Sequence, residues 1–226
     1  MLENRFNPSV FEESIGALTI AANLIVSPIS REWYATWGAT TAETERLLPG
    51  DDLVPNPRLV TTRAIIIHAP ANRIWPWLLQ LGQGRGGLYT FQHLENLARC
   101  QMENVNEIRP ELQSLAVGDQ IRLGPDGYPF YTVDEIRPGE TLVLVTGSGE
   151  ASDTLGTWVF HLEPLNDATT RLIVRSRLVY PPTRANTIIW RAITDPIYFV
   201  MERRMMIGIR DRAEYWATAA RQHATA

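Results

Sequence analysis

The fold is decided by residues 156–180, GTWVFHLEPLNDATTRLIVRSRLVY. Two runs rich in β-branched and aromatic residues flank the turn residues 166–167, which is typical of two antiparallel strands joined by a tight turn. Successive side chains of a strand point to opposite faces. His161 is therefore expected on the outer face. The inward, apolar face carries Trp158, Phe160 and Leu162.

Further short strands are expected on the N-terminal side of this hairpin. Each is rich in β-branched or aromatic residues and is bounded by Gly, Pro, Asn or Asp, as hairpins require. A sequential run of such strands predicts an antiparallel meander. The expected strands cover residues 59–68, 117–123, 128–136 and 141–146.

Helical spacing of apolar residues predicts two short helices over 71–81 and 91–100. A longer helix is expected from Asp195 to about Ala217, with Asp195 as N-cap and Pro196 at the first helical position. Its apolar stripe must be buried against the concave face of the curved sheet. The fold class is therefore α+β, and we expect a ligand in the gap between sheet and helix.

The first 57 residues form an N-terminal extension with a helix over 9–27. Its uncharged run, 15–29, is too short for a membrane span, which needs about 20 residues, and Pro28 interrupts it. Peripheral membrane contact through 9–29 is the alternative to burial. The expected organisation is an extension over 1–57, a main domain over 58–218 and a tail over 219–226.

Composition excludes several functions. The net charge of −4 gives no basic footprint for nucleic acid. Every basic residue is arginine, so Schiff-base, pyridoxal-phosphate and Walker-loop chemistry lack their lysine. The lone Cys100 excludes an intramolecular disulfide. The start shows no cationic leader. A cytoplasmic location is therefore expected, with membrane association as the alternative, while oligomeric state stays open.

Residues 59–216 resemble the START-like superfamily, also called SRPBCC, which includes pollen allergens, lipid-transfer domains and polyketide cyclases. More narrowly, the sequence is similar to a bacterial branch of it. The resemblance implies a helix-grip fold, in which the sheet wraps around the C-terminal helix, and provides no catalytic motif. The motifs that carry it are Trp37-Gly38-Ala39-Thr40, Leu48-Pro49-Gly50-Asp51, Trp75-Pro76-Trp77-Leu78, Gly86-Gly87-Leu88-Tyr89, Leu94-Glu95-Asn96, Val117-Gly118-Asp119 and Thr170-Arg171-Leu172.

The expected function is binding of a small hydrophobic molecule, such as a lipid, isoprenoid or polyketide-like compound, in the cavity between sheet and helix. The glycine-rich loop 82–87 is expected to be a hinge or the lip of this cavity, with Arg85 meeting a ligand oxygen or simply solvated. The expected ligand-binding residues are Trp75, Arg85, Tyr89, Phe130, Trp158, Phe160, Met201 and Met205.

Two alternatives stay open. A cyclase or dehydratase would need an acid–base residue in the cavity, for which the candidates are His93, Glu95, Tyr89 and Tyr131. A structural interpretation instead pairs Glu95 with Arg99 and leaves His93 on the surface. The protein could otherwise act at a membrane surface or on a partner through its N-terminal helix. No cofactor is implied, and the four histidines show no metal-ligand spacing.

Three arginines, Arg171, Arg175 and Arg177, share one face of the last strand, opposite Leu172 and Val174. Because the leucine and valine face the core, we expect the arginines to face water or a partner. The alternative is that Arg175 or Arg177 turns into the cavity to fix an acidic ligand group.

Overall fold

The computed structural model describes residues 5–146 and 155–224. Within these residues, the strands form one antiparallel sheet in the order β1-β6-β5-β4-β3-β2. The predicted meander is therefore confirmed. The first strand of the chain pairs with the last at one edge of the sheet. The strands are β1 (Leu59–Ile67), β2 (Gln120–Arg122), β3 (Phe130–Arg137), β4 (Thr141–Thr146), β5 (Leu155–Asn166) and β6 (Thr169–Val179).

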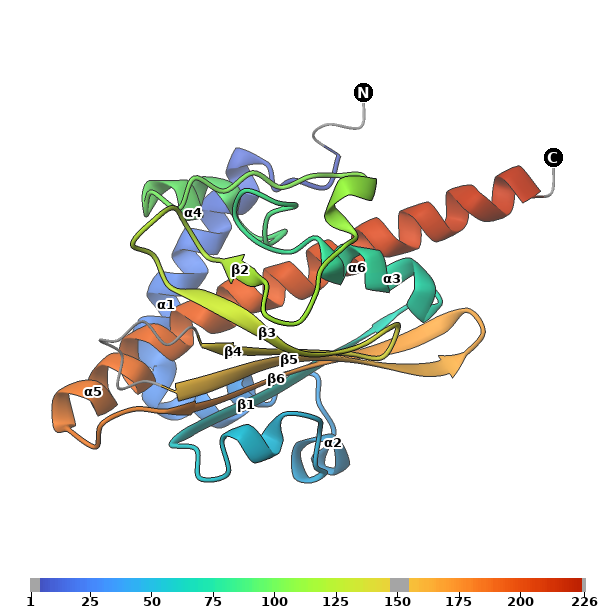
Figure 1. Ribbon diagram of the computed structural model, residues 1–226. Helices are drawn as coiled ribbons and strands as arrows, with labels where there is room; N and C mark the ends of the chain where they lie inside the picture. Colours follow the sequence, from blue (N-terminus) through green and yellow to red (C-terminus); the bar gives the residue numbers. More distant parts are fainter. Residues whose placement is uncertain (1–4, 147–154, 225–226) are drawn as a thin grey trace.

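A long C-terminal helix, α6 (Asp195–Ala224), crosses one face of the sheet, with α3 (Ala71–Leu79) and α4 (Gln92–Leu97) on the same side (Figure 1). Between the sheet and α6, the inward side chains of the strands meet the apolar stripe of the helix and form the main core. This core includes Ile65, Leu144, Trp158, Phe160, Leu172 and Val174 from the strands and Met205, Ile209 and Ala213 from α6.

The start of the C-terminal helix differs from the prediction. The chain is already helical through α5 (Arg184–Ile188) and a π-helical segment, η3 (Ile189–Thr194), so Asp195 has helical backbone angles and is not an N-cap. Its carboxylate instead forms ion pairs inside the protein. The helix also continues to Ala224, and the expected tail is helical over its described part. The last two tail residues, like the first four of the extension, lie outside the described residues.

The N-terminal helix α1 (Val10–Ala35) is longer than predicted. Ser9 and Glu12 close its N-terminus as a capping box. Pro28 does not end the helix, although an interior proline costs about 3 kcal/mol. Packing of α1 against α6 and α4 offsets that cost. At the far end Tyr34 is fully buried and stacks on Phe199 of α6, with ring centroids 5.5 Å apart.

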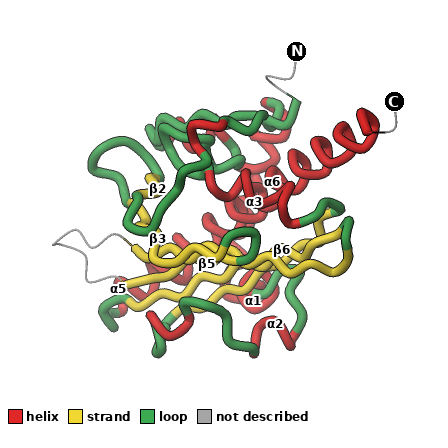
Figure 2. The backbone as a smooth tube through the Cα atoms, turned by 45° about the vertical axis from the view of Figure 1, so that its right-hand side comes forward, coloured by secondary structure: helices red, strands yellow, loops and turns green. Residues whose placement is uncertain are grey.

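The rest of the extension covers the opposite face of the sheet. Figure 2 shows α2 (Thr41–Glu45) on the side of the sheet away from α6. Behind it, Leu48 packs against Ile173 of β6. Gly50 has φ +82°, and a Cβ there would lie 2.6 Å from Val143 of β4, so the chain can cross the sheet this closely only with glycine.

The arginines of β6 hold this segment in place. Arg175, 2% exposed, donates from Nη1 to Asp51 Oδ2 at 2.6 Å and to the Arg46 carbonyl at 2.8 Å. Arg177 Nε donates to the Val54 carbonyl at 2.9 Å. The arginines point away from the cavity, as predicted. Instead of water or a separate partner, Arg175 and Arg177 meet the extension of the same chain.

Candidate functional site

A second buried arginine, Arg63, lies on the inner face of β1 and is 1% exposed. It donates from Nη1 to Glu202 Oε2 at 2.6 Å and from Nε to the Tyr34 carbonyl at 2.8 Å, and its Nη2 lies 3.4 Å from Asp195 Oδ1. We call Arg63, Asp195 and Glu202 the Arg63 cluster. It joins β1 to the N-terminal half of α6 and to the end of α1.

The sequence contains a signal for this cluster that the predictions missed. Arg63 occupies an inward position of β1, in register with Val174. Glu202 occupies the stripe of α6 that also carries Met205 and Ile209, both buried. A charged residue at an apolar position of two facing elements predicts a buried pair, because an isolated buried charge is too costly.

Aromatic side chains border the Arg63 cluster on the sheet side. Trp158 Nε1 donates to Glu202 Oε1 at 2.8 Å. The Trp158 ring lies 5.3 Å from Tyr131 of β3 and 4.7 Å from Phe160, between ring centroids. Tyr198 completes this group from α6, one turn before Glu202. We call Tyr131, Trp158 and Tyr198 the aromatic end of the interior.

The aromatic end is partly accessible to solvent at Tyr198. Tyr198 lies on the same helical stripe as Glu202 and Met205, which are 8% and 1% exposed, yet 45% of its own surface is accessible. Tyr131 opposite is half-buried. Exposure on this stripe therefore rises from the buried Met205 to the half-exposed Tyr198.

Both phenols are neutral hydrogen-bonding groups at physiological pH. Burial raises the pKa of Tyr131, and the nearby Tyr198 and Glu202 raise it further. Burial likewise raises the pKa of Tyr198, with the nearby Cys100 thiol as a second cause. Neither hydroxyl has a hydrogen-bond partner among residues 5–146 and 155–224. They can donate to a ligand or accept from it, and they are poor general bases.

Six of the predicted ligand-binding residues lie in three different places. Trp75, Trp158, Phe160 and Met205 lie in the main core between sheet and α6. Phe130 precedes the inward Tyr131 and points to the other face of β3. Met201 packs with Tyr34 and Phe199 beside α1 instead of facing the sheet. The roles of the four core residues in binding stay predictions.

The glycine-rich loop is held by backbone and side-chain hydrogen bonds. Gly82 and Gly87 are bridged by backbone hydrogen bonds of 2.9 and 3.0 Å. Arg85 donates to the carbonyls of Leu79 and Leu112 at 2.9 and 3.0 Å, which fixes the loop from outside. Tyr89 next to the loop is buried under Arg212, whose guanidinium lies 4.7 Å from the ring centroid.

The proposed acid–base residues do not converge on one point. The His93 side chain is 69% exposed and lies 3.2 Å from Glu13 Oε1, measured from Nδ1. The Tyr89 hydroxyl donates to the Trp77 carbonyl at 3.2 Å, and burial raises its pKa. Tyr131 alone of these four borders the Arg63 cluster. The candidate pairing of Glu95 with Arg99 is absent among the ion pairs of the described residues.

Glu95 is nevertheless in an unusual setting and gives a pH-dependent prediction. Burial and the nearby Glu13 carboxylate raise its pKa to about 7. Folding therefore raises the pKa of Glu95 above its value in the unfolded chain, about 4.3. The free energy of unfolding then falls as pH rises from about 4.3 towards 7, because the buried carboxyl resists ionisation. We expect Glu95→Gln to have a free energy of unfolding about 3 kcal/mol higher than the native protein at pH 8. At pH 4.5 the two proteins should differ little. Urea unfolding at both pH values measures this, and equal effects at both would contradict it.

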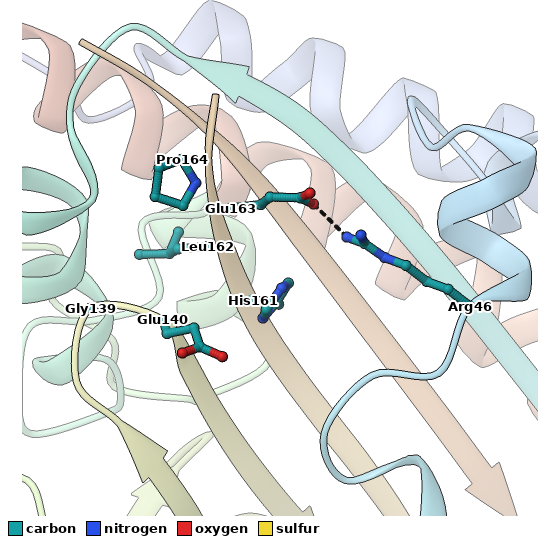
Figure 3. Close-up of a pocket in the computed structure, with 7 residues that line it drawn as sticks. All are labelled: Arg46, Gly139, Glu140, His161, Leu162, Glu163 and Pro164. Carbon is teal, nitrogen blue, oxygen red and sulfur yellow. Dashed lines mark hydrogen bonds and ion pairs between the residues drawn. The ribbon is translucent and has the colours of Figure 1, made fainter. Parts of the chain in front are cut away.

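The pocket shown in Figure 3 lies on the outer face of the sheet, on the side opposite α6. It is open and has a volume of about 400 Å³. His161 lies on the outer face, as predicted, and lines this pocket. Its Nδ1 lies 2.8 Å from Thr141 Oγ1. Burial and the nearby Arg46 lower the pKa of His161. Arg46 and Glu163 form an ion pair across the pocket. Glu140, which also lines it, lies 3.8 Å from Arg137, so both acidic side chains of the lining already face an arginine.

Neither a metal centre nor a membrane span is visible in the described parts of the chain. No group of three or more histidine, cysteine, aspartate or glutamate side chains could hold a metal ion there. Among the same residues, every helix is too short or too polar to cross a bilayer.

No family model and no curated protein matches the chain. Several solved structures do. A conserved protein from Geobacillus kaustophilus is 14% identical with a TM-score of 0.43, covering 69% of this chain and 95% of that one. A norcoclaurine synthase point mutant from Thalictrum is 14% identical with a TM-score of 0.41, covering 69% and 93%. The Aha1 dimer from Colwellia psychrerythraea is 15% identical with a TM-score of 0.39, covering 69% and 96%.

Sheet order and the long C-terminal helix define the class of fold. An antiparallel meander, closed by β1 beside β6 and packed along α6, is the START-like helix-grip fold that the resemblance implied. In this chain an extension covers the second face of the sheet, and a charged cluster lies beneath the first.

Proposed function

We propose that the protein binds a small, mainly apolar molecule at the aromatic end of its interior, between Tyr131, Trp158 and Tyr198. The single observation that carries this is the 45% exposure of Tyr198 on the stripe of α6 that faces the sheet. An aromatic residue in that position is normally buried, because its apolar surface is costly to leave in water. A ligand lying against Tyr198 would cover it.

The charges of the Arg63 cluster favour a neutral ligand. Arg63 already meets Asp195 and Glu202, and Glu202 accepts a second hydrogen bond from Trp158. Arg31 lies 3.6 Å from the other Asp195 oxygen. The two arginines and two carboxylates balance, so a charged ligand group would be desolvated without a partner. The free phenols of Tyr131 and Tyr198 instead suit a carbonyl, ether or hydroxyl oxygen. A lipid alcohol, isoprenoid or polyketide-like molecule with such an oxygen fits this chemistry.

The neutral fluorescent amine N-phenyl-1-naphthylamine provides the test. We expect saturable binding to the native protein, and weaker binding to Tyr198→Ala by about threefold to tenfold, because one aromatic contact contributes about 0.5–1.5 kcal/mol. Phe130→Ala is the matched control, since Phe130 adjoins Tyr131 but faces away from the interior. Equal loss in both variants, or no loss in Tyr198→Ala, would refute this site.

A further inference from the structure

Glu202 lies where the Arg63 cluster meets the aromatic end, and its two carboxylate oxygens have different partners. Oε2 accepts a hydrogen bond from Arg63 Nη1 at 2.6 Å, and Oε1 accepts one from Trp158 Nε1 at 2.8 Å. All three side chains are buried. The carboxylate therefore connects a buried cation to an indole ring of the proposed ligand site.

Ring packing alone does not select the orientation of the Trp158 indole. The strand pairing fixes where the side chain starts, between Leu144 of β4 and Ser176 of β6, but a tryptophan ring still turns about its bond to Cβ. Its planes are tilted by 43° to Tyr131 and 54° to Phe160. Neither angle is the stacked or edge-to-face geometry that aromatic pairs prefer. The hydrogen bond to a carboxylate is stronger and directional, and without it a buried N–H would lose its acceptor.

We propose that Glu202 is a positioning residue for ligand binding, which holds the Trp158 ring at the angle that forms one wall of the site. This role rests on the proposed function, because Trp158 contacts a ligand only at the aromatic end. Arg63 contributes indirectly. Its Nε donates to the Tyr34 carbonyl at 2.8 Å, which fixes the guanidinium between α1 and α6 and thereby the Glu202 carboxylate beside Trp158.

The position needs an acceptor in two directions, which a carboxylate provides and an amide of the same size does not. Glutamine has one carbonyl oxygen and one NH2 group. In Glu202→Gln the charged Arg63 is the stronger donor and takes the oxygen, so the NH2 group faces the N–H of Trp158, donor against donor. The variant therefore keeps the volume of the side chain and the contact with Arg63, but it removes the acceptor of Trp158.

The indole N–H of Trp158 reports this contact in a proton–nitrogen NMR correlation spectrum, where Trp158→Phe assigns the signal by removing it. In Glu202→Gln we expect the signal to move upfield and its hydrogen exchange with water to become at least about tenfold faster, since a hydrogen bond to a charged acceptor is lost. The indole of Trp216, which donates to the Asn106 carbonyl at 3.3 Å, is the internal control and should not change.

Affinity for N-phenyl-1-naphthylamine measures whether the ring orientation matters for binding. We expect Glu202→Gln to weaken binding by about threefold to tenfold, the value of one well-oriented aromatic contact. In a Trp158→Phe background the same substitution should have no further effect, because Glu202 acts through the indole N–H. Glu43→Gln is the matched control. Glu43 is also buried and paired with an arginine, Arg171, but on the outer face, so this variant should keep the Trp158 signal and the native affinity.

Glu202→Asp is a second variant that keeps the negative charge of the cluster, and it decides the question if the glutamine variant does not fold. One methylene shorter, it withdraws its oxygens from the contacts of 2.6 and 2.8 Å, so the Trp158 signal should change in the same direction.

Three results would overturn the positioning role. They are a Trp158 signal that stays unchanged in both Glu202 variants, a changed signal with native affinity, and a Glu43→Gln variant that binds as weakly as Glu202→Gln. Failure of the ligand site itself gives a different result. In that case the Trp158 signal responds to Glu202→Gln as expected, but Tyr198→Ala binds the probe as tightly as the native protein.

Discussion

Asp51→Ala is expected to lower the free energy of unfolding by about 3–5 kcal/mol, the cost of removing one partner of a buried ion pair. Asp51 is 4% exposed and accepts from Arg175 at 2.6 Å, while Arg177 lies 3.6 Å from its other oxygen. Without the carboxylate, Arg175 keeps only neutral acceptors, among them the Arg46 and Glu43 carbonyls. Urea unfolding monitored by circular dichroism measures the loss.

The adjacent Asp52 supplies the control, because it is exposed and makes no ion pair among the described residues. Asp52→Ala should change stability by less than about 0.5 kcal/mol. If Asp51→Ala were as mild, the extension would not be held by the β6 arginines.

The same contacts lead us to propose that residues 1–57 cannot be removed without exposing the outer face of the sheet, so deleting them should yield insoluble protein rather than a folded main domain.

Arg63→Met is expected to cost at least about 3–5 kcal/mol at pH 7, because it leaves the Asp195 and Glu202 carboxylates buried with no nearby cation other than Arg31. The loss should shrink at low pH. Burial already raises the pKa of Asp195, and removal of Arg63 raises it further. At intermediate pH the folded variant therefore keeps a proton on Asp195 that the unfolded chain has released. The loss of unfolding free energy relative to the native protein becomes smaller as pH drops towards about 4.

Urea unfolding of Arg63→Met at pH 7 and pH 4.5 measures both effects. Arg58→Met serves as the control, since Arg58 is exposed at the start of the same strand and its substitution should be nearly neutral at both pH values. A deficit for Arg63→Met that is small, or that grows as pH falls, would contradict the assignment of the cluster as a buried pair.

The arrangement of strands could be predicted from the sequence because strand alternation and turn residues are local properties. The same alternation placed His161, Arg175 and Arg177 on the outer face correctly. It could not show what covers that face. Asp51, which neutralises Arg175, is 124 residues away along the chain, and no local pattern connects them.

The candidate site was only partly predictable for a similar reason. Trp158 and Tyr131 were recognised from their strands. The inward positions of Arg63 and Glu202 indicate that each needs a buried partner, but only the packing of β1 against α6 shows that they pair with each other. Their separation is 139 residues. The length of α1 was missed because Pro28 is a local signal to stop, whereas the contacts with α6 that sustain the helix are distant.

Native mass spectrometry of the purified protein tests the proposed ligand site most directly. The native protein, before and after incubation with farnesol, is compared with Tyr198→Ala and then denatured and extracted. We expect a bound neutral molecule of a few hundred daltons, lost on denaturation and less abundant in Tyr198→Ala. Binding at the aromatic end would be contradicted if the native protein had a ligand-free mass both as purified and with farnesol present. It would also be contradicted if Tyr198→Ala retained the adduct in full.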